Sequence, residues 1–125
     1  MIVLDAGVVI AALDGADVHA AAARALFEEH AESLIHPVNL GEALVHTVQL
    51  GQERTAARQL VQLGVQRAVL GDNHSLHLAR LRAAGTLKMP DCCALVCAEE
   101  HALPLATFDR RLAEVARSHG IIVVT

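Results

Sequence analysis

Short apolar runs alternate along the chain with longer segments of helical periodicity, and this alternation constrains the fold more than any other feature. Short, continuous apolar runs are typical of strands that are buried on both faces of a parallel sheet. Such strands must be joined by crossover connections, which are usually helices. We expect strands at residues 1–4, 33–36, 66–70, 103–107 and 121–124.

The segments between these runs are predicted to be helices. In residues 39–50, for example, Leu40, Ala43 and Val48 follow the spacing of one helix face. Asp17 is predicted to be the N-cap of an alanine-rich helix, because its side-chain oxygen can accept from the free backbone N–H groups of the first turn. The expected helices are 8–13, 17–32, 39–50, 55–63, 73–84, 90–101 and 110–119.

This order of elements predicts a three-layer α/β/α sandwich with a mostly parallel central sheet. The 125 residues match the length of one domain, and no linker, repeat or low-complexity tract divides them. We therefore expect a single domain over residues 1–125. Sheets of this kind bind ligands at the carboxyl ends of the strands, near a switch in strand order.

Composition excludes several classes of protein. Hydrophobic residues make up 54% of the chain, which provides a core and argues against disorder. No apolar run is long enough for a membrane span, and no basic region opens a signal peptide, so we expect a cytoplasmic protein. Phe27 and Phe108 are its only Phe, Tyr or Trp residues, which argues against platforms that stack nucleic-acid bases.

The net charge of −4 opposes nucleic-acid binding by a basic surface alone. This objection weakens where carboxylates gather around bound metal, because the cations then reverse the local field. The net charge therefore discriminates poorly between proteins that bind RNA and proteins that do not.

Four acidic residues occupy positions that can converge at the carboxyl edge of the predicted sheet. Asp5 follows the first strand, and Asp109 follows the strand at 103–107. Glu42 lies near the start of a helix that leaves the same edge, and Asp91 lies in the first turn of another helix. Taken singly, each aspartate is explained as well by helix capping, and Glu42 by a favourable position in the helix dipole. Their joint placement favours a site.

Carboxylates that lie close together repel each other and cannot all ionise without cost. A hard divalent cation such as Mg²⁺ or Mn²⁺ removes that cost, since these ions prefer oxygen ligands. One or two such ions can activate water and stabilise the leaving oxygen of a phosphodiester. This chemistry points to a metal-dependent nuclease.

The four acidic segments, in this order and at this spacing, resemble the PIN-domain family, and especially its VapC-type toxin ribonucleases. The resemblance covers essentially the whole chain, and each segment alone is a weak signal. The segments are Ile2-Val3-Leu4-Asp5-Ala6-Gly7-Val8-Val9-Ile10, Asn39-Leu40-Gly41-Glu42-Ala43-Leu44, Met89-Pro90-Asp91-Cys92-Cys93-Ala94-Leu95 and Leu103-Pro104-Leu105-Ala106-Thr107-Phe108-Asp109.

The resemblance implies a Mg²⁺- or Mn²⁺-dependent endoribonuclease. Its metal ligands, or the acids that orient them, would be Asp5, Glu42, Asp91 and Asp109, with Thr107 as a supporting hydroxyl. The family's usual setting implies a toxin that is held inactive by a cognate antitoxin protein and that often forms a homodimer.

Gly7 departs from the family pattern, which often has Asn or Ser two positions after the first acid. A polar side chain that could orient Asp5 or a water molecule is therefore missing. Together with the acidic net charge, this motivates an alternative: a non-catalytic PIN-like module that acts through protein or RNA contacts. Gly7 also excludes aspartate-nucleophile phosphatases, which need a second acid at this position, and no Walker loop or dinucleotide-binding glycine pattern is present.

Further residues carry weaker signals. Arg110 and Arg111 follow Asp109 and are candidates to hold RNA phosphate, although solvation or pairing with Asp109 explains them slightly better. His46 lies one helical turn after Glu42 and is a candidate to orient it. His74 and His77 share a helix face, but no third ligand completes a zinc site, and we expect most histidines to lie on the surface. The neighbouring Cys92, Cys93 and Cys97 are odd in number and too close together for a disulfide framework, so we expect buried, apolar packing.

Overall fold

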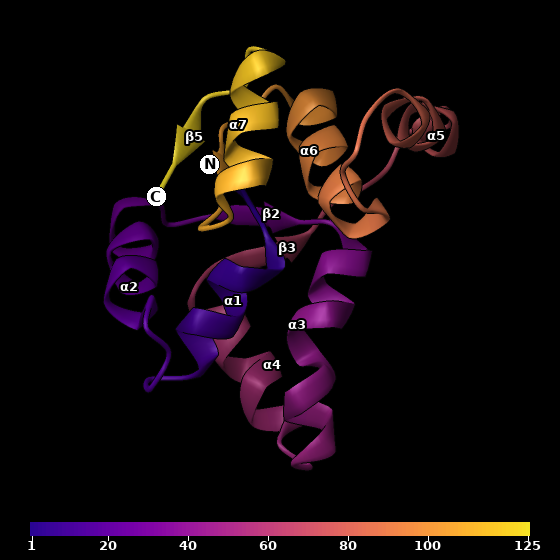
Figure 1. Cartoon of the computed structure of the whole chain (residues 1–125). Helices are drawn as coiled ribbons and strands as arrows, with labels where there is room; N and C mark the ends of the chain where they lie inside the picture. The colour runs from indigo at the N-terminus through magenta and orange to yellow at the C-terminus, as the bar shows by residue number, and fades with distance from the viewer.

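Five short strands form one parallel sheet at the centre of the molecule (Figure 1). The computed structural model describes residues 1–125. The strand order is β3-β2-β1-β4-β5, and every neighbouring pair is parallel. The strands are β1 (Ile2–Leu4), β2 (Ser33–Ile35), β3 (Val65–Arg67), β4 (Leu105–Ala106) and β5 (Val123–Val124).

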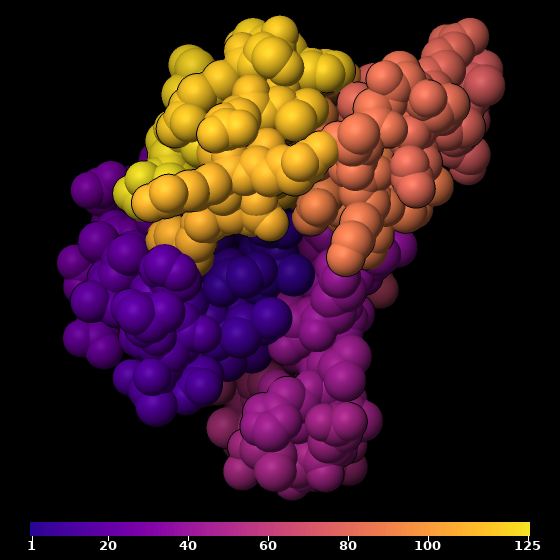
Figure 2. Space-filling view, viewed as in Figure 1, coloured from indigo at the N-terminus to yellow at the C-terminus, as the bar shows by residue number.

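Seven helices connect and cover these strands. They are α1 (Ala6–Leu13), α2 (Ala20–Glu29), α3 (Pro37–Gln49), α4 (Glu53–Gln62), α5 (His74–Ala84), α6 (Met89–His101) and α7 (Arg110–Ser118). In Figure 2, α3 and α4 form a projection at one end of the molecule, and α5 projects at another corner. None of the helices is long and apolar enough to serve as a membrane span.

The two faces of the sheet are buried under separate groups of helices. Ile2 and Leu4 point into a cluster with α1, α2, α3 and α4, whereas Val3 points into a cluster with α5, α6 and α7. Successive side chains of a strand point to opposite faces, so an uninterrupted apolar run serves both cores. The predicted three-layer α/β/α sandwich is therefore confirmed, and its sheet is entirely parallel.

Each predicted element is present, but some of the predicted ends are wrong. The alanine-rich helix α2 begins at Ala20 with His19 as its N-cap, not at Asp17. Asp17 instead accepts a hydrogen bond from the backbone N–H of His19, two residues on. The carboxylate of Asp17 thus forms a local turn before the helix starts and does not cap the helix. The strands are shorter than the apolar runs, because pairing with a neighbouring strand sets their ends.

The strand order reverses direction at β1. The chain passes from β1 to β2 and β3 on one side, and then returns to β4 and β5 on the other. The carboxyl ends of β1 and β4 therefore flank a topological switch point, which is where open α/β sheets bind ligands. The first turns of α3 and α6 pack against each other beside this point (Figure 1).

Candidate active site

Asp5 stands at the carboxyl end of β1, with both of its carboxylate oxygens held. It is the N-cap of α1, and its Oδ1 accepts from the backbone N–H of Ala6 at 2.9 Å. Its Oδ2 accepts from the Thr107 hydroxyl at 2.8 Å. Burial raises the pKa of Asp5, the hydrogen bonds from Thr107 and Ala6 lower it in part, and the Asp109 and Glu42 carboxylates raise it further.

Thr107 connects Asp5 to the second aspartate of this edge. It is fully buried after β4, and its Oγ1 also accepts from the backbone N–H of Asp109 at 3.0 Å. Asp109 is the N-cap of α7, where its Oδ1 accepts from the N–H of Leu112 at 3.0 Å. One hydroxyl thus orients the carboxylate of Asp5 and the loop that carries Asp109.

Glu42 lies on the second turn of α3 and receives a hydrogen bond from its own helix. The Asn39 amide donates to Glu42 Oε1 at 3.2 Å and to the carbonyl of Pro90 at 2.9 Å. Pro90 precedes Asp91 in the first turn of α6. A single amide group therefore connects the helix segments that carry Glu42 and Asp91.

Asp91 is the most perturbed carboxylate of the chain. Burial, followed by the charges of Asp5, Asp109 and Glu42, raises its pKa to about 6, and Lys88 lowers it only in part. No hydrogen bond contributes to this shift. The structure therefore brings Asp91 into the electrostatic range of the other three acids, although no strand directly precedes its helix. Unlike Asp5 and Asp109, Asp91 caps no helix, since the N-cap of α6 is Lys88.

The four acids have no cationic partner among the side chains. Every ion pair in the chain joins a histidine to Glu99 or Glu100. As the side chains stand, no group of three or more His, Cys, Asp or Glu residues is close enough to hold a metal ion. The donor set nevertheless fits a hard divalent cation, because it consists of carboxylate oxygens that form no ion pair and whose charges raise the pKa of Asp5 and Asp91.

Two hollows border the acids. One, of about 310 Å³, lies between α1 and α3 and is lined by Glu42 and His46. No hydrogen bond joins these two side chains, since Glu42 is held by Asn39. The other hollow, of about 300 Å³, is lined by Thr107 and Asp109 together with Arg110 and Arg117. In Figure 2 the indigo start of the chain reaches the surface between the yellow α7 and the magenta α3.

Arg110 and Arg111 are neighbours in α7, but their side chains reach different parts of the molecule. Arg110 lines the hollow beside Asp109. Arg111 instead donates to the Thr86 hydroxyl in the loop between α5 and α6. The two candidate phosphate contacts predicted from the sequence therefore differ, and only Arg110 lies beside the acids.

Gly7 lies exposed in the first turn of α1, two residues after Asp5. A Cβ atom at this position would meet no heavy atom within 4 Å. The structure therefore leaves room for the serine or asparagine that the family often has there.

A chain of buried and half-buried histidines is a feature that the sequence did not predict. His36 and His74 are 4% and 6% exposed, so both are exceptions to the expectation that most histidines lie on the surface. His36 Nδ1 accepts from the N–H of Val38, so its Nε2 carries the proton and donates to His74 Nε2 at 2.8 Å. His74 must then donate from Nδ1 to Glu100, at 2.9 Å. These contacts define one neutral tautomer for each ring and tie β2 to α5 and α6.

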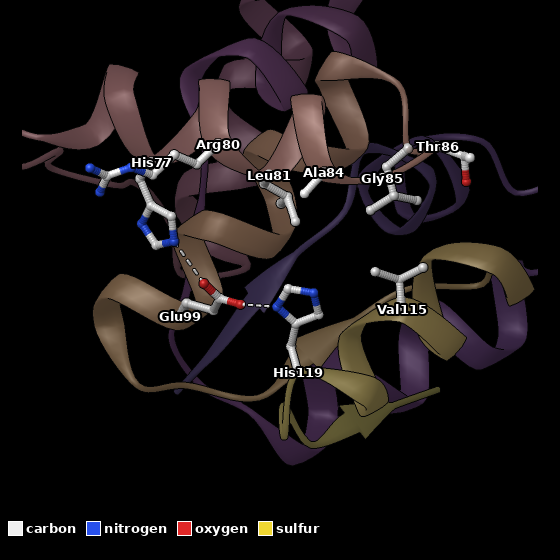
Figure 3. A pocket seen from close by; sticks show the side chains of 10 residues that line it. His77, Arg80, Leu81, Ala84, Gly85, Thr86, Glu99, Val115 and His119 are labelled. Carbon is white, nitrogen blue, oxygen red and sulfur yellow. Dashed lines mark hydrogen bonds and ion pairs between the residues drawn. The ribbon is translucent and has the colours of Figure 1, made fainter.

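A further hollow, of about 410 Å³, lies between α5, α6 and α7, apart from the four acids. Figure 3 shows the Glu99 carboxylate between the rings of His77 and His119 at one end of it. The distances are 2.8 Å from His77 Nε2 and 2.7 Å from His119 Nδ1. These contacts join the three helices of this layer.

The three cysteines are free and buried in α6. Burial raises the pKa of the Cys93 thiol to about 11 and that of Cys97 to about 12. Thiols with these values remain protonated near neutral pH and are poor nucleophiles.

Known proteins share this architecture. A family model for the PIN domain matches residues 2–118. A comparison with curated proteins found no match. Among solved structures, a toxin–antitoxin complex from Klebsiella pneumoniae has a TM-score of 0.79 at 21% identity, covering 100% of this chain and 97% of that chain.

Two further structures have similar folds. VapC20 of Mycobacterium tuberculosis has a TM-score of 0.74 at 12% identity, covering 92% of this chain and 95% of that chain. FitAcB from Neisseria gonorrhoeae has a TM-score of 0.72 at 16% identity, covering 100% of this chain and 97% of that chain. At these identities the likeness shows the fold, whereas the family model covers nearly the whole sequence. The chain therefore belongs to the PIN-domain family, as its four acidic segments predicted.

Proposed function

We propose that this chain is a Mg²⁺- or Mn²⁺-dependent endoribonuclease that hydrolyses RNA phosphodiester bonds, with residues 1–125 working as one nuclease domain. The observation that carries this proposal is the group of four carboxylates without an ion-pair partner beside the topological switch point. Burial and mutual repulsion raise the pKa of Asp91 to about 6 there. Strongly perturbed groups of this kind cluster at functional sites.

Asp5, Glu42, Asp91 and Asp109 would hold the metal, and the supporting side chains keep them in place. The ion, when bound, supplies polarisation of water and stabilisation of negative charge on the leaving oxygen. The Thr107 hydroxyl holds Asp5 Oδ2 and the backbone of Asp109. The Arg110 guanidinium, beside Asp109, is placed to bind an RNA phosphate next to the scissile bond.

The biological setting proposed is that of a cytoplasmic VapC-type toxin with a cognate antitoxin protein and a homodimeric assembly. The similar structures support the antitoxin, because they include a toxin–antitoxin complex from Klebsiella pneumoniae and VapBC2 from Rickettsia felis. VapC20 is a toxin that cleaves the sarcin–ricin loop, which supports RNA as the substrate class. The exposed apolar side chains of Val45, Val48 and Val61 lie on α3 and α4, which pack together, and they favour a protein interface on this part of the chain.

The test is cleavage of a labelled RNA pool by the purified chain with Mn²⁺, Mg²⁺ or chelator. We expect cleavage with either metal and none with chelator. Glu42→Gln should lower the rate by roughly 100-fold, the upper end of the cost of disturbing the groups around a metal. Glu53→Gln, the same change on an exposed glutamate at the start of α4, should leave the rate unaltered.

Two outcomes would overturn the proposal. One is the absence of cleavage with every metal, by folded protein free of antitoxin. The other is cleavage that persists in chelator or in Glu42→Gln at the wild-type rate. The first would favour the non-catalytic module, and Gly7→Asn would then show whether the missing polar side chain accounts for the loss.

Arg110 and Arg111 provide a matched pair for the substrate side of the site. We expect Arg110→Ala to raise KM for RNA roughly tenfold, the cost of one charge-assisted hydrogen bond. It should also reduce the slope of log affinity against log salt concentration by about 1, the contribution of one phosphate contact. Arg111→Ala, which removes the contact with Thr86, should change KM by less than about twofold, as is usual for surface substitutions. Equal effects of the two substitutions on KM would contradict this assignment.

A further inference from the structure

Asn39 is a fully buried polar side chain at the third position of α3, with no exposed surface. Its Nδ2 group donates both hydrogen bonds of the residue, to Glu42 Oε1 and to the carbonyl oxygen of Pro90. Its Oδ1 is buried and has no hydrogen-bond partner. The Nδ2 group of Asn39 therefore has both of its hydrogen-bond acceptors, whereas its Oδ1 has no donor.

The orientation of this amide follows from its neighbours. The carboxylate of Glu42 and the carbonyl of Pro90 are both acceptors, so a flipped amide would place Oδ1 against two oxygens. Only the NH₂ group can face them, and it uses one hydrogen for each. The contact between the two helix segments thus depends on an NH₂ group, which can donate two hydrogen bonds in different directions.

Asn39 and the Pro90 carbonyl that it binds are 51 residues apart in the sequence, whereas Glu42 lies in the same helix as Asn39. Asn39 holds Glu42, and it also binds the carbonyl of Pro90, which directly precedes Asp91. The separation of these two carboxylates is therefore set by α3, α6 and the amide between them. A metal ion that both acids bind requires that separation to stay constant.

Apolar packing alone does not require an asparagine at this position. A buried acceptor without a partner destabilises the folded chain, and an apolar side chain of similar shape would avoid that cost. What an apolar side chain cannot do is donate to Glu42 and Pro90 at once. The feature that distinguishes Asn39 from an apolar residue is therefore its contact with the acidic site.

We propose that Asn39 is a positioning residue, whose amide sets Glu42 against Asp91 so that both bind the same divalent cation. This inference rests on the proposed function, since it takes the four acids as the metal site. It goes beyond the acids themselves by naming the side chain that fixes the spacing of two of them.

The test is Mn²⁺ binding by the purified chain, followed by the electron paramagnetic resonance of free Mn²⁺, for the wild type and Asn39→Leu. We expect Asn39→Leu to weaken Mn²⁺ binding at least about tenfold, as for other groups that orient metal ligands. Its melting temperature in chelator should change little, because removal of the unpaired Oδ1 offsets the loss of the two hydrogen bonds. A merely structural role would lower the melting temperature and leave the affinity of the folded fraction unchanged.

Ser33→Ala is the matched control. Ser33 is also buried and its hydroxyl also has no partner, but it lies at the start of β2, opposite the end of the strands that carries the acids. Its replacement should maintain or raise the melting temperature and leave Mn²⁺ binding at the wild-type level. Weaker Mn²⁺ binding by Ser33→Ala would count against the specific role of Asn39.

Asn39→Asp gives a second and opposite test with a side chain of the same shape. If only the number of carboxylates mattered, this fifth acid would tighten Mn²⁺ binding. Because the NH₂ group is lost and Glu42 is repelled, we expect weaker binding. Wild-type or tighter binding by either folded variant would overturn the inference. Absence of Mn²⁺ binding by the wild type would remove the proposed function as well, so the two failures are distinguishable.

Discussion

Asp91→Asn is expected to abolish RNA cleavage and, with metal chelated, to make the protein more stable. The rate should fall on the order of 1,000-fold or more, as for residues that act as part of one catalytic unit. The gain in stability has an electrostatic origin. Asparagine keeps the shape of the side chain and removes a charge that burial and three other carboxylates oppose.

The sign and size of the stability change follow from the pKa of Asp91. Its pKa rises from 3.8 in the unfolded chain to about 6 in the folded protein, so the folded state binds this proton more tightly. The contribution of Asp91 is therefore most favourable below pH 3.8 and is lost as the pH rises through about 6. At pH 8 the ionised group costs on the order of 2 kcal/mol, since one pKa unit corresponds to about 1.4 kcal/mol and solvent screens part of the charge of this half-buried side chain.

The measurement is the melting temperature of wild type and Asp91→Asn in chelator between pH 4 and 8. The variant should melt about 8 °C higher at pH 8, and the two curves should converge toward pH 4. Asp72→Asn, the same change on an exposed aspartate, should shift neither the melting temperature nor the rate. Equal melting temperatures at pH 8 would contradict the proposed crowding of charge, and undiminished cleavage would remove Asp91 from the site.

Gly64→Ala is expected to destabilise the fold more than any surface substitution. Gly64 ends the segment after α4 with φ +76°, and a Cβ there would lie 2.0 Å from the backbone oxygen of Ala31. Its own carbonyl accepts from the N–H of Ser33 at 3.0 Å, which holds this backbone against the start of β2. We expect a loss of at least about 3 kcal/mol, from the left-handed backbone and the overlap together.

Gly120→Ala separates these two contributions. Gly120 has φ +78°, but a Cβ at this position meets nothing within 4 Å. It should therefore cost only the backbone strain of about 1–2 kcal/mol. The free energy of unfolding of both variants, measured by urea titration with circular dichroism, provides the comparison. A Gly64→Ala protein as stable as Gly120→Ala would show that the Ala31 segment moves aside freely.

The order and type of the elements were predictable from local pattern. Ile2, Val3 and Leu4 show why, since both faces of the sheet are covered and each residue of the run must be apolar. The ends were less predictable. Asp17 has the chemistry of an N-cap, but the turn it forms with His19 lies before the helix. Capping propensity is the same at several nearby residues, and tertiary packing chooses among them.

The four acids were found as a group because three of them follow strand ends or helix starts, which topology brings to one edge. Asp91 was the least certain from sequence, since its helix follows a loop. The roles of Asn39 and His36 could not be read from sequence. An asparagine three residues before a glutamate on one helix is a signal for a local contact, but its second partner, Pro90, is far along the chain.

Sequence by itself therefore determined the α/β/α architecture and the family, and it predicted the acids of the candidate site, because periodicity and motif spacing are local properties of the chain. Only the tertiary structure decided which oxygen each donor reaches, which histidines are buried and that Arg110, and not Arg111, lies beside Asp109. These depend on contacts between segments that are distant in sequence, and a hydrogen bond or a pKa shift exists only once packing has excluded water and fixed the partners.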